Sequence, residues 1–323
     1  MATSRDAGYH RAAMWVRTMS CLMIAACSFQ PLKLGGGSDA APGDAATDCF
    51  QAWMDHTVQI SSSAVKEISE LSIANENSRN PWISADGLRM YFARDQGTTN
   101  TLDIYFTHRD STAMPFGAPV AMTNLNSPDD EGRAWLTPDE LTLVLSSDRG
   151  GPTTNILMAT RTAGAAFGSP STGYLTAVNM VGTERNDPFL SPDGLRLYLS
   201  VNAGPGGRFL IMLATRSSTM DDFGTPLQVP GTAFTSNSLG DPALYQGERL
   251  LVFSVIDGTG SADLWYATRA SPTEPFGTAA EIPGVNSVDT EFDVVLGADG
   301  CDVYFASDRG SSNFHLFQAP ITR

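Results

Sequence analysis

The sequence predicts an all-β fold, a β-propeller of four-stranded blades, and three observations support this prediction. A motif built around an Asp-Gly turn recurs at intervals of 53, 54, 54 and 52 residues, measured at one turn position. Each repeat holds four strand-like segments separated by turn residues, and no repeat has a helical period. Self-similarity of this kind is typical of propeller blades. The turn position is occupied by Asp86, Asp139, Asp193, Gly247 and Asp299.

Residues 1–26 have the features of a bacterial export signal. Three arginines precede a short apolar region over residues 18–26. Ile24, two alanines and Cys27 resemble the bacterial lipobox, which implies cleavage before Cys27 and acylation of that cysteine. An ordinary signal peptide with an incidental Cys27 is the alternative. We expect a lipoprotein that meets the membrane only through its lipid, at the periplasmic face of the outer membrane or at the cell surface.

Residues 27–48 are predicted to be a flexible tether that carries the lipidated Cys27. The segment is rich in Gly, Ala, Asp and Pro and has little apolar surface to bury. The chain as a whole has a formal net charge of −15 and only two lysines, Lys33 and Lys66. Such a chain repels phosphate backbones, so nucleic-acid binding is not expected.

The segment Val65–Leu71 is predicted to close the ring. The fifth repeat ends after its third strand-like segment, whereas Val65–Leu71 is a strand-like segment with no repeat of its own. Leu71 lies 15 residues before the first turn Asp, and Leu125 lies 14 residues before the second. We therefore predict that this strand completes the last blade, which removes the exposed sheet edges of an open ring. Five blades are expected, with six as the alternative, in a domain over residues 49–323 whose repeats start near 80, 133, 187, 241 and 293.

Within a repeat, a short apolar strand leads into the Asp-Gly turn, and an alternating strand follows it. Leu195, Leu197 and Leu199 share one face of such a strand. The third strand ends on an arginine and the fourth follows a Phe-Gly pair. We expect the repeated turn Asp to serve turn geometry rather than catalysis, because it recurs in nearly every blade. Arg149 and Arg309, in two Ser-Asp-Arg-Gly loops, are expected to form loop salt bridges, with anion or calcium binding as the alternative.

The phrase Ser-Pro-Asp-Gly at 191–194, followed by an alternating strand, and the Ser-Asp-Arg-Gly loops at 147–150 and 307–310 resemble the WD-type repeats of TolB-like propellers. The resemblance covers about residues 62–323. It implies a propeller fold and a protein partner in the cell envelope, and it carries over no individual binding residue. The fourth repeat departs from the motif at its first turn.

One position before the first strand of each blade holds the candidate binding residues. The first strand of a propeller blade is innermost, so these residues should ring one mouth of the channel, with four glutamates just before them (Glu76, Glu131, Glu184 and Glu291). Three aspartates in one ring would raise one another's pKa values and could hold a cation or exchange protons. A structural role at the start of the strand is the alternative. The five residues are Asn80, Arg133, Asp187, Asp241 and Asp293.

Other chemistry finds little support in the sequence. We identify no nucleophile elbow, phosphate-binding loop or zinc motif, and assign no catalytic residue, no metal ligand and no cofactor. Trp82, Trp135 and Phe189 share one slot on the innermost strands and are expected to pack between blades rather than to cage a ligand.

Cys49 and Cys301 are predicted to form a disulfide. They are the cysteines that remain after the signal peptide and Cys27 are set aside, and exported proteins keep disulfides. Cys301 follows the first turn of the last blade, and Cys49 shortly precedes the strand that closes that blade. The alternative is that Cys301 fills an apolar core position and Cys49 lies in the tether.

From these features we expect a non-catalytic, membrane-tethered binding module of the cell envelope, monomeric, with a protein or glycan partner. The alternative is a carbohydrate-active enzyme that uses Asp187, Asp241 and Asp293. Five-bladed glycoside hydrolases place carboxylates near this position, and such an enzyme needs two of them about 5 to 10 Å apart in an open pocket.

Overall fold

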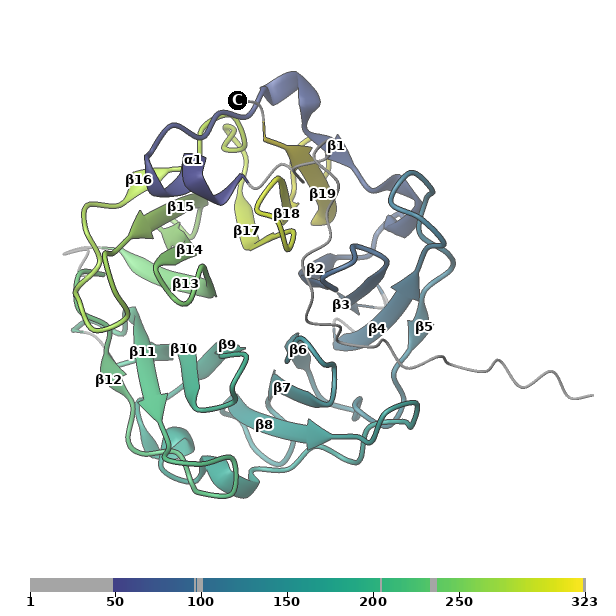
Figure 1. Ribbon diagram of the computed structural model, residues 1–323. Helices are drawn as coiled ribbons and strands as arrows, with labels where there is room; N and C mark the ends of the chain where they lie inside the picture. Colours follow the sequence, from purple (N-terminus) through teal and green to yellow (C-terminus); the bar gives the residue numbers. More distant parts are fainter. Residues whose placement is uncertain (1–48, 96, 98–100, 204, 233–236, 322–323) are drawn as a thin grey trace, which may run out of the picture. The chain divides into compact units, whose positions relative to one another are not determined.

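The computed structural model describes residues 49–321 except 96, 98–100, 204 and 233–236. The predicted signal peptide, Cys27 and the tether therefore lie outside the described residues. Five antiparallel β-sheets are arranged as the blades of a ring, which confirms the predicted propeller and its blade count (Figure 1). Among the described residues, no helix is both long and apolar enough to cross a membrane.

The first four blades are each formed by consecutive strands. Blade 1 comprises β2 (Ser78–Ile83), β3 (Arg89–Asp95), β4 (Leu102–His108) and β5 (Val120–Ala121). Blade 2 comprises β6 (Glu131–Leu136), β7 (Thr142–Ser147) and β8 (Asn155–Thr160). Blade 3 comprises β9 (Arg185–Leu190), β10 (Arg196–Asn202), β11 (Phe209–Thr215) and β12 (Leu227–Gln228). Blade 4 comprises β13 (Ser238–Tyr245), β14 (Leu250–Ile256), β15 (Ala262–Thr268) and β16 (Ala280–Glu281).

The fifth blade combines both ends of the described chain. Its inner strands are β17 (Glu291–Leu296), β18 (Asp302–Ser307) and β19 (His315–Pro320), and its outermost strand is β1 (Lys66–Glu67). Lys66 pairs with Gln318 and Glu67 with Phe317 in antiparallel register. The N-terminal strand therefore closes the ring as predicted, although it is shorter than Val65–Leu71.

The outer edge of the blades departs from regular four-stranded sheets. In blade 2 the fourth strand is reduced to one bridge, in which Met158 and Ser171 exchange backbone hydrogen bonds. After β1, the chain turns into a short 3₁₀ helix whose Leu71 is buried. The other short helices are α1 (Phe50–Met54) and 3₁₀ segments at Ser62–Ala64, Gly173–Leu175 and Val178–Met180.

The core lies within and between the blades, where the inner strands are buried along most of their length. The two ends of the innermost strands define two faces of the ring. The Asp-Gly turns lie on one face, hereafter the turn face. The five predicted mouth residues lie toward the other face, hereafter the carboxylate face.

Candidate functional site

The five mouth residues all lie at a β-bulge in the innermost strand of their blade. The register of the first two strands shifts in every blade at this point. Asn80, Asp187, Asp241 and Asp293 have φ between +53° and +65°, in the left-handed region. Asn and Asp tolerate this conformation better than other residues with a side chain. The backbone conformation of the bulge is therefore one reason why Asp and Asn occupy this slot. This agrees with the alternative that these residues have a structural role at the start of the strand.

The side chains of this slot link blade 3 to blade 4, blade 4 to blade 5 and blade 5 to blade 1. The Asp241 N–H donates to Asp187 Oδ2 at 3.4 Å, and the Asp293 N–H donates to Asp241 Oδ2 at 3.1 Å. The Asn80 N–H donates to Asp293 Oδ2 at 3.1 Å, and Asn80 Nδ2 donates to Asp293 Oδ1 at 2.5 Å. The carboxylates therefore satisfy backbone donors that the bulges leave outside the strand ladder.

Arg133 takes the place of an acid in blade 2 and lies at the centre of this group. Its side chain is 1% exposed, and Nη1 lies 3.4 Å from Asp241 Oδ1. Its guanidinium lies 5.6 Å from the ring centre of Trp135. Nε and Nη2 have no hydrogen-bond partner among the described residues. Arg133 thus reaches from the acidic group toward the aromatic residues nearer the turn face.

The three carboxylates are compact, and their burial changes their protonation. One oxygen from each of Asp187, Asp241 and Asp293 lies within 4.8 Å of the other two. Burial and the charge of Asp241 raise the pKa of Asp187 to about 7. Burial, again with Asp241, also raises the pKa of Asp293 well above its usual value. Such a group can share protons, and its oxygens are of the type that Mg²⁺ or Ca²⁺ accepts as ligands.

A cavity of about 290 Å³ opens above the group on the carboxylate face. Asp187 is half-buried at its floor, whereas the Asp241 and Asp293 residues are only 3% and 4% exposed. The Glu residues just before the slot do not join it: Glu131 and Glu291 are fully buried and bind Arg149 and Arg309 at 2.9 and 2.8 Å. The Ser-Asp-Arg-Gly loops therefore form the salt bridges that the sequence predicted.

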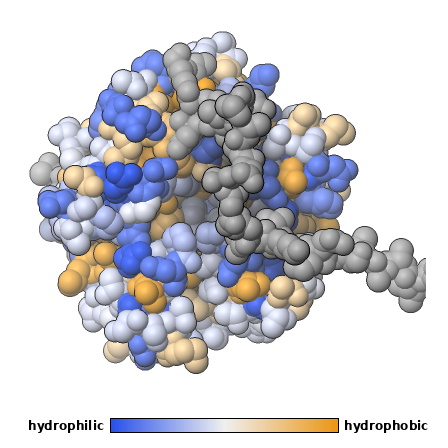
Figure 2. All heavy atoms as spheres, viewed as in Figure 1, coloured by the Kyte–Doolittle hydropathy of each residue, from blue (hydrophilic) through white to orange (hydrophobic). Residues whose placement is uncertain are grey.

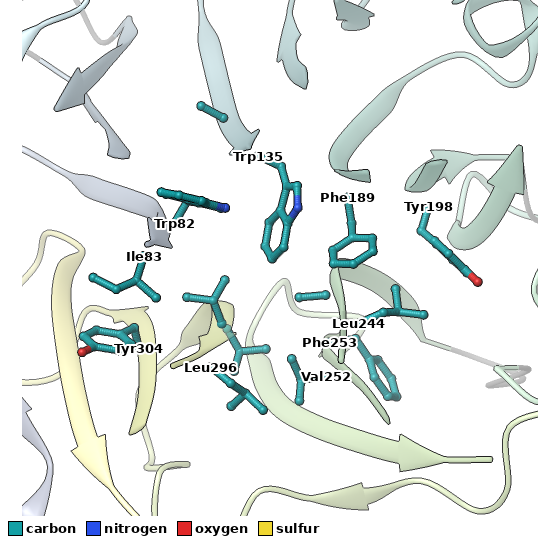
Figure 3. Packing of buried hydrophobic residues seen from close by; sticks show 14 of the residues in the cluster. Trp82, Ile83, Trp135, Phe189, Tyr198, Leu244, Val252, Phe253, Leu296 and Tyr304 are labelled. Carbon is teal, nitrogen blue, oxygen red and sulfur yellow. The ribbon is translucent and has the colours of Figure 1, made fainter. Parts of the chain in front are cut away.

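The mouth on the turn face is apolar. Trp82, Trp135 and Phe189 come from three blades and point toward the ring axis, where they meet Leu244 and Leu296 of the other two (Figure 3). The rings of Trp135 and Phe189 are 4.6 Å apart, and Trp82 Nε1 donates to Leu136 of the next blade at 3.2 Å. These residues pack between blades as expected. They also line a recess of about 160 Å³.

The turn face also carries α1, which lies against blade 4 and next to blade 5 (Figure 1). A disulfide joins Cys49 to Cys301, the two cysteines that the sequence predicted to pair. Trp53 is fully buried, and its Nε1 donates to Gly300 at 2.9 Å. The start of the described chain is therefore fastened to the turn of blade 5. Figure 2 shows this side of the molecule, where hydrophilic residues predominate and apolar residues are scattered.

A set of contacts within the blades was not assigned from the sequence. The arginine that ends the third strand donates through Nε to a carbonyl of its own blade's first turn in four blades. The same guanidinium stacks on the phenylalanine of the Phe-Gly pair at 4.3 to 4.4 Å. The sequence shows that both the arginine and the phenylalanine recur in each of these blades. It does not show that the two side chains contact each other. The arginines are Arg109, Arg161, Arg216 and Arg269, and the phenylalanines are Phe116, Phe167, Phe223 and Phe276.

Comparison with known proteins gives likeness of fold. No family model matches the sequence, and no curated protein is significantly similar to it. A thermostable family-43 glycoside hydrolase matches with a TM-score of 0.54 at 12% identity, over 77% of this chain and 90% of that one. The catalytic domain of the Coprinopsis cinerea GH62 α-L-arabinofuranosidase matches with a TM-score of 0.52 at 14% identity, over 76% and 91%.

TolB from Acinetobacter baumannii is similar to the chain at 13% identity with a TM-score of 0.47. The match covers 77% of this chain and 55% of TolB, so the chain spans about half of that protein's length. Structural neighbours thus include glycoside hydrolase propellers and TolB propellers. At their identities, the two hydrolase matches show likeness of fold alone.

Proposed function

We propose that this chain is a non-catalytic, membrane-tethered binding module of the bacterial cell envelope, of the TolB-like kind. The observation that carries the proposal is the use of the acidic group as a set of links between blades. Asp241 and Asp293 are almost inaccessible, and each accepts a backbone hydrogen bond from the next blade. The three aspartates and Asp130 all line the cavity, but among the three only Asp187 is more than 4% exposed. Glycoside hydrolysis needs two carboxyl groups that flank the scissile bond.

The compactness of the acidic group supports the same conclusion. Inverting hydrolases separate their two carboxyls by about 6.5 to 9.5 Å so that a water fits between them, and retaining hydrolases by about 5 to 5.5 Å. Here the three oxygens lie within 4.8 Å of one another, and Arg133 occupies the space behind Asp241. The likeness to GH43 and GH62 propellers is therefore taken as likeness of scaffold, which does not fix function.

The apolar recess on the turn face is the proposed binding site for a protein partner. Its volume of about 160 Å³ accepts one large apolar side chain, and a buried apolar anchor is typical of the centre of a protein interface. Trp82 Nε1 already donates to Leu136, so the recess offers little hydrogen bonding to a sugar. Because the chain carries a net charge of −15, we propose that basic residues flank the apolar anchor of the partner.

The test uses peptides selected from a random library on the full chain. We expect the selected peptides to share one large apolar residue flanked by Lys or Arg. Pro138 is exposed at the rim of the recess, and the same turn position holds Ala85 in blade 1. Pro138→Arg, which covers the recess and repels a basic flank, should weaken peptide binding by about tenfold or more. Pro138→Ala, the matched control, should leave it unchanged.

The enzymatic alternative is tested in parallel. The full chain should not hydrolyse an aryl α-L-arabinofuranoside, the substrate type named for the GH62 neighbour. Hydrolysis that disappears in Asp187→Asn would overturn the proposal. Selected peptides without an apolar anchor, or peptides that bind Pro138→Arg equally well, would overturn the assignment of the recess.

A further inference from the structure

A glutamate in the first turn of blade 2 fastens that blade to blade 1. Glu140 Oε1 accepts from Arg89 Nε at 2.8 Å, and Oε2 accepts from Arg161 Nη2 at 3.0 Å. Arg89 belongs to blade 1 and Arg161 to blade 2. Tyr91, two residues after Arg89, also lies beside Arg161. The carboxylate thus fills a junction formed by two arginines and a tyrosine.

The junction between blades 3 and 4 repeats this arrangement. Glu248 occupies the same turn position, and its Oε2 accepts from the Tyr198 hydroxyl at 2.6 Å. Arg196 Nε donates to the other oxygen, and Arg269 Nη2 lies 3.7 Å from Oε2. The turn requires positive φ, +56° at Glu140 and +67° at Glu248, which glycine adopts more readily. The side-chain contacts therefore offset a backbone cost at both glutamates.

The junction between blades 5 and 1 has the tyrosine and the arginine but lacks the glutamate. Tyr304 stands where Tyr91 and Tyr198 stand, and Arg109 stands where Arg161 and Arg269 stand. The glutamate position holds Gly87, with φ of +69°. A pocket of about 500 Å³ occupies this junction, with Arg109, Tyr304, Asp299, Asp302 and Gln318 in its wall.

Arg109 is held in place for binding by contacts on its other atoms. Its Nε donates to the Gly87 carbonyl at 2.8 Å, and its guanidinium stacks on Phe116 at 4.3 Å. Within the described part of the chain, Nη2 reaches only the Tyr304 hydroxyl, at 3.5 Å, the outer limit of a hydrogen bond. In the equivalent junctions these two groups face a glutamate carboxylate. They are thus arranged for a carboxylate that the chain itself does not supply here.

The second arginine of the other junctions is replaced by an acid. Asp302 stands where Arg89 and Arg196 stand, and Asp299 adds a second carboxylate to the pocket wall. A third, Asp86, is already paired with Arg89 and Ser84. Gln318 Nε2 donates to Asp302 at 3.0 Å. A ligand with a carboxylate alone would be repelled on this side. A ligand that also carries a cationic group would be attracted on both sides.

The remaining junctions lack this combination. Between blades 2 and 3, Arg216 faces a turn glycine, but Val144 takes the place of the tyrosine. Between blades 4 and 5, a Cβ added to Gly300 would lie 2.8 Å from the Phe50 ring, so that side chain already occupies the space.

We propose that the junction of blades 5 and 1 binds a zwitterionic ligand of the amino-acid or short-peptide class. The ligand carboxylate accepts hydrogen bonds from Arg109 Nη2 and the Tyr304 hydroxyl, and its ammonium group lies toward Asp302 and Asp299. The volume agrees with that of small-molecule sites in general. This site is independent of the proposed protein partner, because none of these four residues lines the apolar recess.

The test measures binding of three probes to the full chain by titration calorimetry: glycylglycine, acetate and methylammonium. Glycylglycine should bind at one site, at least about tenfold more tightly than either single ion. Gly87→Glu supplies the missing carboxylate from the turn, as Glu140 and Glu248 do, and should abolish binding. Gly194→Glu is the matched control, since an added Cβ there meets the same kinds of atoms, a threonine methyl and an arginine nitrogen. This variant and Pro138→Arg should bind glycylglycine normally.

A reciprocal variant tests the chemistry in another junction. Glu140→Gly removes the carboxylate between Arg89 and Arg161, where no acid takes the place of Asp302. This variant should gain a second site that prefers acetate over glycylglycine, and acetate should raise its Tm. Tyr304→Phe should weaken glycylglycine binding several-fold. If Gly87→Glu does not fold, this variant tests the proposed site in its place, and unchanged binding by Tyr304→Phe would then refute it. The proposal is wrong if glycylglycine does not bind, if acetate binds as tightly, or if a folded Gly87→Glu binds as the unaltered chain does.

Discussion

The side chains on the ring axis show how a left-handed backbone position can determine chemistry. A bulge with positive φ favours Asn or Asp, and four of the five blades place such a residue at this slot. Because the bulges place these carboxylates close together, nearby groups must offset their negative charge. Arg133, the one slot residue with another backbone conformation, provides a cation, and backbone N–H groups provide the rest. Electrostatic balance at this site is thus a consequence of the bulges.

The raised pKa of Asp187 predicts a pH dependence of stability. Burial and Asp241 raise this pKa to about 7 in the folded chain, from an ordinary value of 3.8. The folded state then binds more protons than the unfolded state between these values, so stability should fall as pH rises from about 4 to about 7. Asp187→Asn removes the ionisation and keeps an oxygen acceptor. The free energy of unfolding of Asp187→Asn, relative to that of the unaltered chain, should therefore be higher at pH 8 than at pH 4.5. The difference should be at most about 4 kcal/mol.

Urea unfolding of both proteins at several pH values measures this effect. Asp289→Asn, at an exposed carboxyl, is the control and should leave the pH profile unchanged. Parallel profiles for the unaltered chain and Asp187→Asn would contradict the prediction.

Among the elements, the sequence was most informative where a repeat could be aligned. The turn interval predicted the inner strands of all five blades, and the segment at Val65–Leu71 predicted the ring closure. The length of the closing strand was wrong, because an outermost strand pairs on one side only and Leu71 is buried by a 3₁₀ turn instead. Glu140 and Glu248 were missed because a residue that replaces the turn glycine looks like loss of the motif. Their role becomes clear only from the neighbouring blade's side chains, Arg89 for Glu140 and Arg196 with Tyr198 for Glu248.

The closing segment should be required for folding. A chain that begins at residue 49 keeps the disulfide, α1 and β1, and it should be as stable as the full chain. A chain that begins at residue 73 loses Phe50, Trp53, Ile68 and Leu71, all buried, and exposes β19 as an edge. Side chains of this size contribute about 2 to 5 kcal/mol each, so we expect aggregation or a severe loss of stability. Light scattering and thermal unfolding measure both, and a stable monomer from residue 73 would refute the role of this segment.

For the whole molecule, the prediction concerns its attachment. We expect that labelled fatty acid is incorporated into the full chain in a bacterial host and that Cys27→Ala abolishes the incorporation. The reason is that the lipobox resemblance places the acylated thiol at Cys27. Cys49→Ser is the control, because it lies beyond the predicted tether and should not change labelling. Label in Cys27→Ala, or none in the unaltered chain, would show that residues 24–27 are not a lipobox.

The position of the closing strand has a consequence for the time course of synthesis. Blades 1 to 4 consist of consecutive strands, so each can form as soon as its own segment has been made. The last blade needs β1, which is made first, and β19, which is made last. At ordinary elongation rates the separation of 252 residues from Cys49 to Cys301 takes about 13 to 50 s to make. Oxidation of this cysteine pair therefore reports when the start of the domain first meets the turn of the last blade.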